Sequence, residues 1–125
     1  MQIIRGTTPT ITANVRSSID LDAVEEVWAY IYQQGRVVID KKLSDSGTQI
    51  TIDTDNKKIT VELTQEDTLA LRANTGAIFQ MRLIMGDTAL ATNSFNVMVR
   101  EVYKDGIIGV PNQNNGGSTN EWKFI

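Results

Sequence analysis

Hydrophobic and polar residues alternate along most of the chain with a period of two, which is typical of half-buried β-strands. Residues 8–15 place Ile11, Ala13 and Val15 on one face and threonine or asparagine on the other, with Pro9 near the start. The segment 27–32 is apolar on both faces and rich in β-forming residues, which is typical of a central strand. The remaining predicted strands are residues 36–43, 48–54, 58–63, 77–85 and 88–94, with residues 95–99 continuing or following the last of these.

Turn-forming residues separate these segments, with Gln34-Gly35, Asp55-Asn56 and Gly86-Asp87 each closing a predicted hairpin. The period changes only at residues 64–71, where Thr64 can cap a helix and acidic residues fill its first turn. About seven short strands with frequent turns favour an all-β fold: an antiparallel, Ig-like β-sandwich with one short helix. A partly open barrel is the alternative.

The inward-facing positions of the predicted strands and helix supply the expected core. It consists of Ile11, Val15, Ile31, Ile39, Ile52, Val61, Leu69, Phe79, Met81, Leu83 and Val97. We expect one sandwich domain over residues 1–108. Residues 109–125 are rich in glycine and asparagine until the last four positions, and we expect a flexible C-terminal tail there.

Composition argues against several classes of function. The formal net charge of −3, with acids and bases interspersed, predicts neither nucleic-acid nor membrane binding. The first residues lack the apolar segment of a secretory signal peptide. The chain has no cysteine and no histidine, so thiolate chemistry and the Ser-His-Asp arrangement are unavailable. We therefore expect no enzyme activity, no catalytic residue, no metal site and no cofactor.

Two acidic clusters fit structural roles better than chemical ones. Residues 53–56 begin like a calcium loop, but Lys58 and Thr64 stand where that loop needs glycine and glutamate, so a hairpin turn is favoured. The carboxylates at positions 25, 26, 66 and 67 come without any accompanying catalytic motif. Neighbours in a strand point to opposite faces, and acids in a first helical turn serve the helix dipole.

Two groups of aromatic or apolar residues are candidate interaction sites. Trp28, Tyr30 and Tyr32 share one face of a predicted strand. Such a row is more often part of a core or an interface than a platform for stacking on sugar rings, and glycan binding remains the alternative. At the other end of the chain, Trp122, Phe124 and Ile125 follow the predicted flexible tail. They would suit docking on a partner or folding back onto the sandwich.

Three short segments carry a resemblance to a known family. They are residues 5–10 (Arg-Gly-Thr-Thr-Pro-Thr), 63–69 (Leu-Thr-Gln-Glu-Asp-Thr-Leu) and 104–108 (Lys-Asp-Gly-Ile-Ile). Across residues 2–108 the chain resembles small tail- or baseplate-associated proteins of phages and prophages in Gram-positive bacteria, in particular the N-terminal β-sandwich domain of upper baseplate proteins. The resemblance implies a virion structural protein, assembled in the host cytoplasm, that contacts other tail proteins and forms a homo-oligomer.

Overall fold

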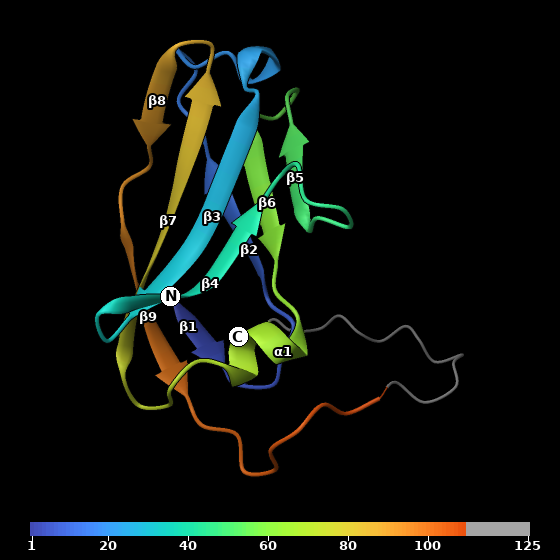
Figure 1. The fold of residues 1–125 in the computed structure, drawn as a ribbon, viewed down its shortest axis with the longest axis vertical. Helices are drawn as coiled ribbons and strands as arrows, with labels where there is room; N and C mark the ends of the chain where they lie inside the picture. Colours follow the sequence, from blue (N-terminus) through green and yellow to red (C-terminus); the bar gives the residue numbers. More distant parts are fainter. Residues whose placement is uncertain (110–125) are drawn as a thin grey trace.

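The computed structural model describes residues 1–109, which form two β-sheets packed face to face (Figure 1). The strands are β1 (Gln2–Ile4), β2 (Thr10–Asn14), β3 (Glu26–Gln33), β4 (Arg36–Lys42), β5 (Ile50–Asp53), β6 (Lys58–Glu62), β7 (Gly76–Met85), β8 (Thr88–Ala91) and β9 (Phe95–Arg100). The helices are a 3₁₀ helix, η1 (Leu21–Ala23), and one α-helix, α1 (Gln65–Leu69). The prediction of an all-β fold with one short α-helix is confirmed.

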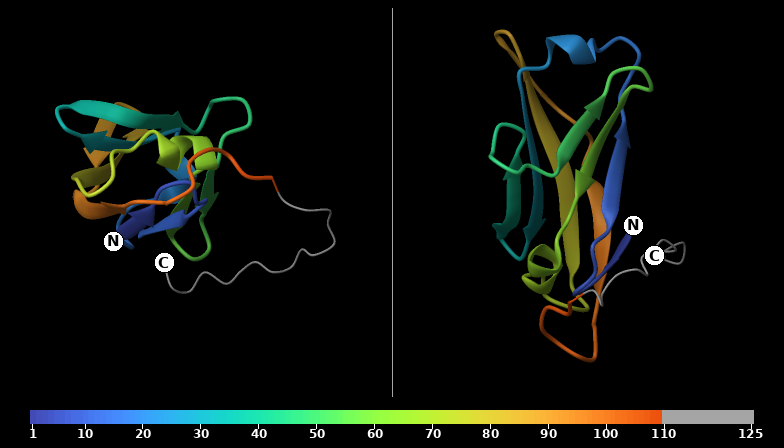
Figure 2. Two further views of the ribbon diagram at one scale, coloured as in Figure 1. Left: turned by 90° about the horizontal axis from the view of Figure 1, so that it is seen from below. Right: turned by 90° about the vertical axis from the view of Figure 1, so that its right-hand side faces the viewer.

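One sheet has the strand order β1-β9-β7-β3-β4, with β8 also pairing with β7, and the other has the order β2-β6-β5. In the right-hand view of Figure 2, β3 and β4 lie on one side of the molecule and β2 on the other. Strands β8 and β9 pair with successive parts of β7, on the side of β7 opposite β3, so together they act as one interrupted strand. A sheet of three strands thus packs on a sheet of six, as in Ig-like β-sandwiches.

The structure departs from the sequence prediction at the start of the chain. The alternation pattern does not predict strand β1, which pairs with β9 in parallel, whereas the other strand pairs of the described residues are antiparallel. With three residues, β1 is too short to show alternation, yet its Ile3 is only 1% exposed. The connector near residues 20–23 contains η1, which buries Leu21.

Local sequence signals explain the turns and the helix. Gln34 and Gly35 both have positive φ, 51° and 83°, as a two-residue type I′ hairpin between β3 and β4 requires. At α1, Thr64 Oγ1 accepts a hydrogen bond from the Asp67 backbone N–H at 3.0 Å, and Asp67 Oδ2 accepts one from the Thr64 N–H at 2.8 Å. This capping box confirms that Thr64 is the N-cap.

The core lies between the two sheets and follows most of the predicted positions. Of the predicted core residues, Val15, Ile52 and Leu69 are only half-buried, and the rest are buried. The buried set also includes Ile3, Ala13, Leu21, Val27, Ala29, Ile50, Ile59, Leu63, Leu71, Ala77 and Val99. Val15, Ile52 and Leu69 lie at or near the ends of their elements, where the second layer covers them less completely.

One buried polar residue ties a loop to the larger sheet. Gln33, at the end of β3, is 3% exposed. Its Nε2 donates hydrogen bonds to the backbone oxygens of Arg72 (2.9 Å) and Thr75 (3.2 Å), and its Oε1 accepts one from the Arg72 N–H (2.7 Å). The side chain thus satisfies backbone groups of the segment between α1 and β7.

Candidate functional site

The outer faces of the two sheets differ sharply in composition. On the three-stranded sheet the outward residues are polar or charged, as expected for a surface in contact with water. They are Thr10, Thr12, Asn14, Thr51, Asp53, Lys58, Thr60 and Glu62. This face provides an internal standard for a solvated surface of the same domain.

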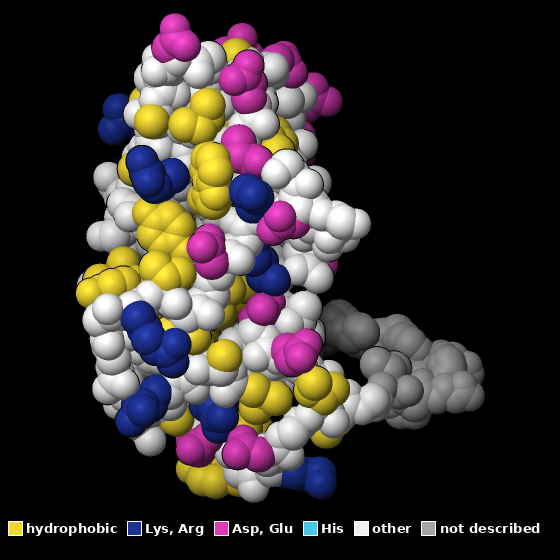
Figure 3. Space-filling view, in the orientation of Figure 1, with side chains coloured by type: hydrophobic (Ala, Val, Ile, Leu, Met, Phe, Trp, Pro, Cys, Tyr) yellow, Lys and Arg dark blue, Asp and Glu magenta, His cyan; other side chains and the backbone are white. Residues whose placement is uncertain are grey.

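The outer face of the six-stranded sheet instead carries large apolar side chains. Tyr32, Val37, Ile78 and Met98 are 42%, 46%, 38% and 45% exposed, respectively. Figure 3 shows hydrophobic side chains in a band down this face, with basic and acidic side chains interspersed. The half-buried Trp28, Tyr30 and Ile84 complete the set on β3 and β7. We call this surface the aromatic face.

The predicted aromatic row therefore lies on the surface and not in the core. Because Val27, Ala29 and Ile31 point inward, the alternate residues Trp28, Tyr30 and Tyr32 must point outward. A surface position is compatible with two of the interpretations of this row: a protein interface, or a platform for stacking on sugar rings. The other candidates, Trp122, Phe124 and Ile125, and the predicted tail from residue 110 onwards lie outside the described residues.

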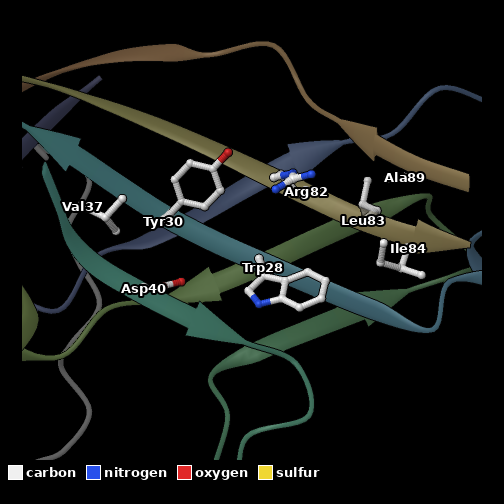
Figure 4. A pocket seen from close by; sticks show the side chains of 8 residues that line it. All are labelled: Trp28, Tyr30, Val37, Asp40, Arg82, Leu83, Ile84 and Ala89. Atoms are coloured by element: carbon white, nitrogen blue, oxygen red, sulfur yellow. The ribbon is translucent and has the colours of Figure 1, made fainter.

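A shallow groove of about 360 Å³ crosses the aromatic face. Figure 4 shows Trp28 and Tyr30 projecting from β3, with Arg82 on β7 to one side and Asp40 on β4 to the other. Tyr30 Oη donates a hydrogen bond of 2.7 Å to Gln80 Oε1, which fixes the orientation of the phenol ring. The groove thus combines two aromatic rings with one exposed cation and one exposed anion.

Sequence reasoning does not single out Asp40 and Arg82. The alternation of polar and apolar residues could have placed Asp40 and Arg82 on the outer face. Their neighbours in the strands point inward; these are Ile39, Met81 and Leu83. Cross-strand register is the missing information. It aligns Arg82 with Trp28 and Tyr30 with Asp40, and so places both charges beside the aromatic row.

Two of the carboxylates weighed as catalytic candidates, Glu26 and Asp67, have structural partners. Glu26 accepts hydrogen bonds from the backbone N–H groups of Ser44 (3.0 Å) and Val27 (3.1 Å). Hydrogen bonding by the Ser44 side chain, together with these backbone bonds, lowers the pKa of Glu26. Asp67 caps α1 and pairs with Lys41 Nζ at 2.7 Å. Burial raises the pKa of Asp67, but its bonds to Lys41 and Thr64 outweigh that effect and leave the pKa lowered.

Asp53 also has a local structural role. It accepts hydrogen bonds from the backbone N–H and the side chain of Asn56, at 3.1 and 2.9 Å, as expected for a hairpin turn. Within residues 1–109, no group of three or more Asp or Glu side chains is arranged to hold a metal ion.

The three segments behind the family resemblance meet at the α1 end of the sandwich. The Arg5 guanidinium donates hydrogen bonds to the backbone oxygens of Leu69 (3.0 Å) and Leu71 (2.9 Å), and it pairs with Glu101 (2.7 Å) and Asp105 (3.0 Å). These contacts fasten the first loop and the segment after β9 to the helix.

Two further contacts complete this cluster. Thr68 Oγ1 donates a hydrogen bond of 2.9 Å to the Thr7 backbone oxygen. Gln65 exchanges two 2.8 Å bonds with the backbone of Ile108. The segments thus hold the fold together at one end, which gives their residues a packing role.

No protein-family model matches the sequence, and a search of curated proteins finds no match. Across residues 1–109, no helix has the length and apolar character needed to cross a membrane.

Proposed function

We propose that this chain is a structural module of a phage or prophage virion, in its tail or baseplate, and that it acts through protein–protein contacts made by the aromatic face. The observation that carries the proposal is the contrast between the two outer faces of one sandwich. The three-stranded sheet presents threonine, asparagine and charged side chains, whereas the six-stranded sheet presents tyrosine, tryptophan, isoleucine and methionine. Contiguous exposed apolar surface on a small domain marks an interaction site.

The virion setting is supported by the family resemblance over residues 2–108. Tyrosine, tryptophan and methionine are enriched at protein interfaces, and among the described residues the groove brings together no group of acidic side chains that could hold a metal ion. The edges and faces of the sandwich are then its main means of action, and virion assembly uses repeated contacts between such domains.

The test is to locate the chain in particles. Antibody raised against the purified protein is applied to virions induced from the source bacterium and purified by density gradient, followed by gold-labelled electron microscopy. We expect label at the tail or its tip and recovery of the chain in the particle fraction by mass spectrometry. Absence from particles that contain their other tail proteins would overturn the virion assignment.

The role of the aromatic face is tested by comparing two variants, one on each outer face of the sandwich. Tyr32→Asp places a charge on that face, and Thr12→Asp places the same charge on the polar outer face of β2. Supplied in trans to a host that lacks the gene, Thr12→Asp is expected to enter particles normally, and Tyr32→Asp to be excluded. Equal incorporation of both variants would show that the aromatic face is not used.

Glycan binding at the cell surface is the second candidate, because Trp28 and Tyr30 line an open groove together with Asp40 and Arg82. Aromatic rings stack on sugars, and charged groups bond their hydroxyls. A Trp122→Phe variant leaves Trp28 as the sole tryptophan of the chain. We expect cell-wall glycans to leave its fluorescence unchanged. Saturable quenching at micromolar glycan, with calorimetric binding lost in Trp28→Ala, would establish the second function instead.

A further inference from the structure

Two opposite charges stand within the aromatic face, each without a partner among the described residues. Arg82 on β7 and Asp40 on β4 are both exposed and flank Trp28 and Tyr30 (Figure 4). The ion pairs found in residues 1–109 involve only Arg5 and Lys41 as cations. A protein that covers this face buries both charges, and burial of an unpaired charge is strongly unfavourable. The occupant must therefore offer an acid to Arg82 and a base to Asp40.

We propose that the occupant is a second copy of this chain, packed aromatic face to aromatic face across a two-fold axis. In such an interface, if residue i of one copy contacts residue j of its partner, then j also contacts i. An axis that lies in the interface, perpendicular to the line between Arg82 and Asp40, sets each Arg82 over the partner's Asp40. One symmetry operation therefore pairs both charges, and it brings the aromatic rows together. The inference rests on the proposed function, since it names the partner of the same face.

The size of the face fits this occupant. The five strands of the order β1-β9-β7-β3-β4 lie about 4.8 Å apart, and the eight residues of β3 span about 27 Å, so the face measures roughly 500 Å². Two copies then bury about 1,000 Å², which is below the roughly 1,200–2,000 Å² of stable specific interfaces and in the range of weak, transient ones. We therefore expect a dimer in reversible equilibrium with its monomer. The polar face of the other sheet offers no comparable apolar area among the described residues.

The test uses the full chain in sedimentation velocity and light scattering across a concentration series that brackets the micromolar range. We expect the mass to rise from one chain to two. In a dimer of Arg82→Glu, the carboxylate introduced at position 82 faces the partner's Asp40 at both symmetric contacts. In a dimer of Asp40→Lys, the amine introduced at position 40 faces the partner's Arg82 at both contacts. Each variant alone is expected to weaken dimerisation at least tenfold. An equimolar mixture of the two variants is expected to restore it. In the mixed dimer, the carboxylate introduced at position 82 of one chain faces the amine introduced at position 40 of the other, while the second contact keeps the original Asp40–Arg82 pair.

Lys58→Glu is the matched control for Arg82→Glu, because it makes the same change in net charge on the exposed outer face of β6. It is expected to dimerise like the wild type, and circular dichroism melts confirm that each variant folds. A wild type that stays monomeric throughout, an Arg82→Glu variant that dimerises normally, or a mixture that stays monomeric overturns the proposal. A monomeric chain that still labels the tail refutes only the dimer, and a dimeric chain absent from particles refutes only the virion function.

Discussion

Replacing Gln33 by leucine removes the link between β3 and the segment that leads from α1 to β7. The side chain is 3% exposed, and it forms three hydrogen bonds with the backbone of Arg72 and Thr75. Leucine fills a similar volume but bonds none of these groups. An unsatisfied buried group costs about 1–3 kcal/mol, and the lower value applies here because the loop can turn its groups toward water.

Three groups at about 1 kcal/mol each give an expected loss of about 3 kcal/mol, a large share of the ~5–15 kcal/mol that stabilises a typical domain. At roughly 4 °C per kcal/mol, the melting temperature should fall by about 12 °C. The assay is urea unfolding followed by circular dichroism, in which the midpoint should fall while the denaturant dependence stays constant.

Two further variants separate the hydrogen bonds from other effects. Gln2→Leu makes the same change at an exposed position of β1 and should alter stability by no more than about 0.5 kcal/mol. Gln33→Glu keeps the shape and one acceptor but points a carboxylate at two backbone oxygens, so it should be at least as unstable as Gln33→Leu at neutral pH. If Gln33→Leu unfolds at the same urea concentration as the wild type, the three hydrogen bonds of Gln33 do not stabilise the fold.

Three other outcomes follow from the described contacts. Leu83→Ala, in the core at 2% exposure, should cost about 2–4 kcal/mol in thermal or urea unfolding, and an unchanged melt would mean that β7 faces the other way. Because the pKa of Asp67 is lowered in the folded state, its pair with Lys41 stabilises the fold above about pH 4 and is lost as the pH falls below that. Asp67→Asn should therefore melt below the wild type at neutral pH, with the gap closing in acid below about pH 4, and a gap independent of pH would contradict this account. Deleting residues 110–125 should leave both the melting temperature and the oligomeric state by light scattering unchanged, since the described core ends at Val99 and dimerisation is assigned to the aromatic face. Unfolding of the truncated chain would show that residues 110–125 stabilise the fold, and a drop to the monomer would show that they join the two copies.

The parts of the fold visible in the sequence are those with a strong local signal. Alternation over five or more residues locates β2 and β7, a continuous run of apolar β-forming residues locates β3, and the capping pattern at Thr64 locates α1. Strand β1 is not predicted, because Ile3 is its only buried position and its pairing with β9 depends on a contact between the two ends of the domain. No local pattern encodes such a contact. For the same reason Gln33 looks like an ordinary polar residue at the end of a strand, although its partners lie 39 and 42 positions away.

The candidate site is visible only in part. Period two groups Trp28, Tyr30 and Tyr32 on one face, but it does not tell which face of the sheet meets the second layer. That choice depends on the burial of Val27, Ala29 and Ile31, which is a property of the packed sandwich. Asp40 and Arg82 join the row through the register of three adjacent strands, which alternation within any one strand does not specify.

The parallel pairing of β1 with β9 also sets the order in which the domain can form. Arg5 and Glu101 are 96 positions apart, and the Met98 N–H bonds the Met1 backbone oxygen at 2.9 Å. Closing a loop of this length is entropically slow, and domains dominated by such distant contacts fold in milliseconds to seconds. On the ribosome, the first strand synthesised must wait for the last one before the sheet is complete. Until then, the backbone groups of β1 have no partner strand and lie open to other chains, so this docking step is where crowded synthesis of many copies risks mispairing.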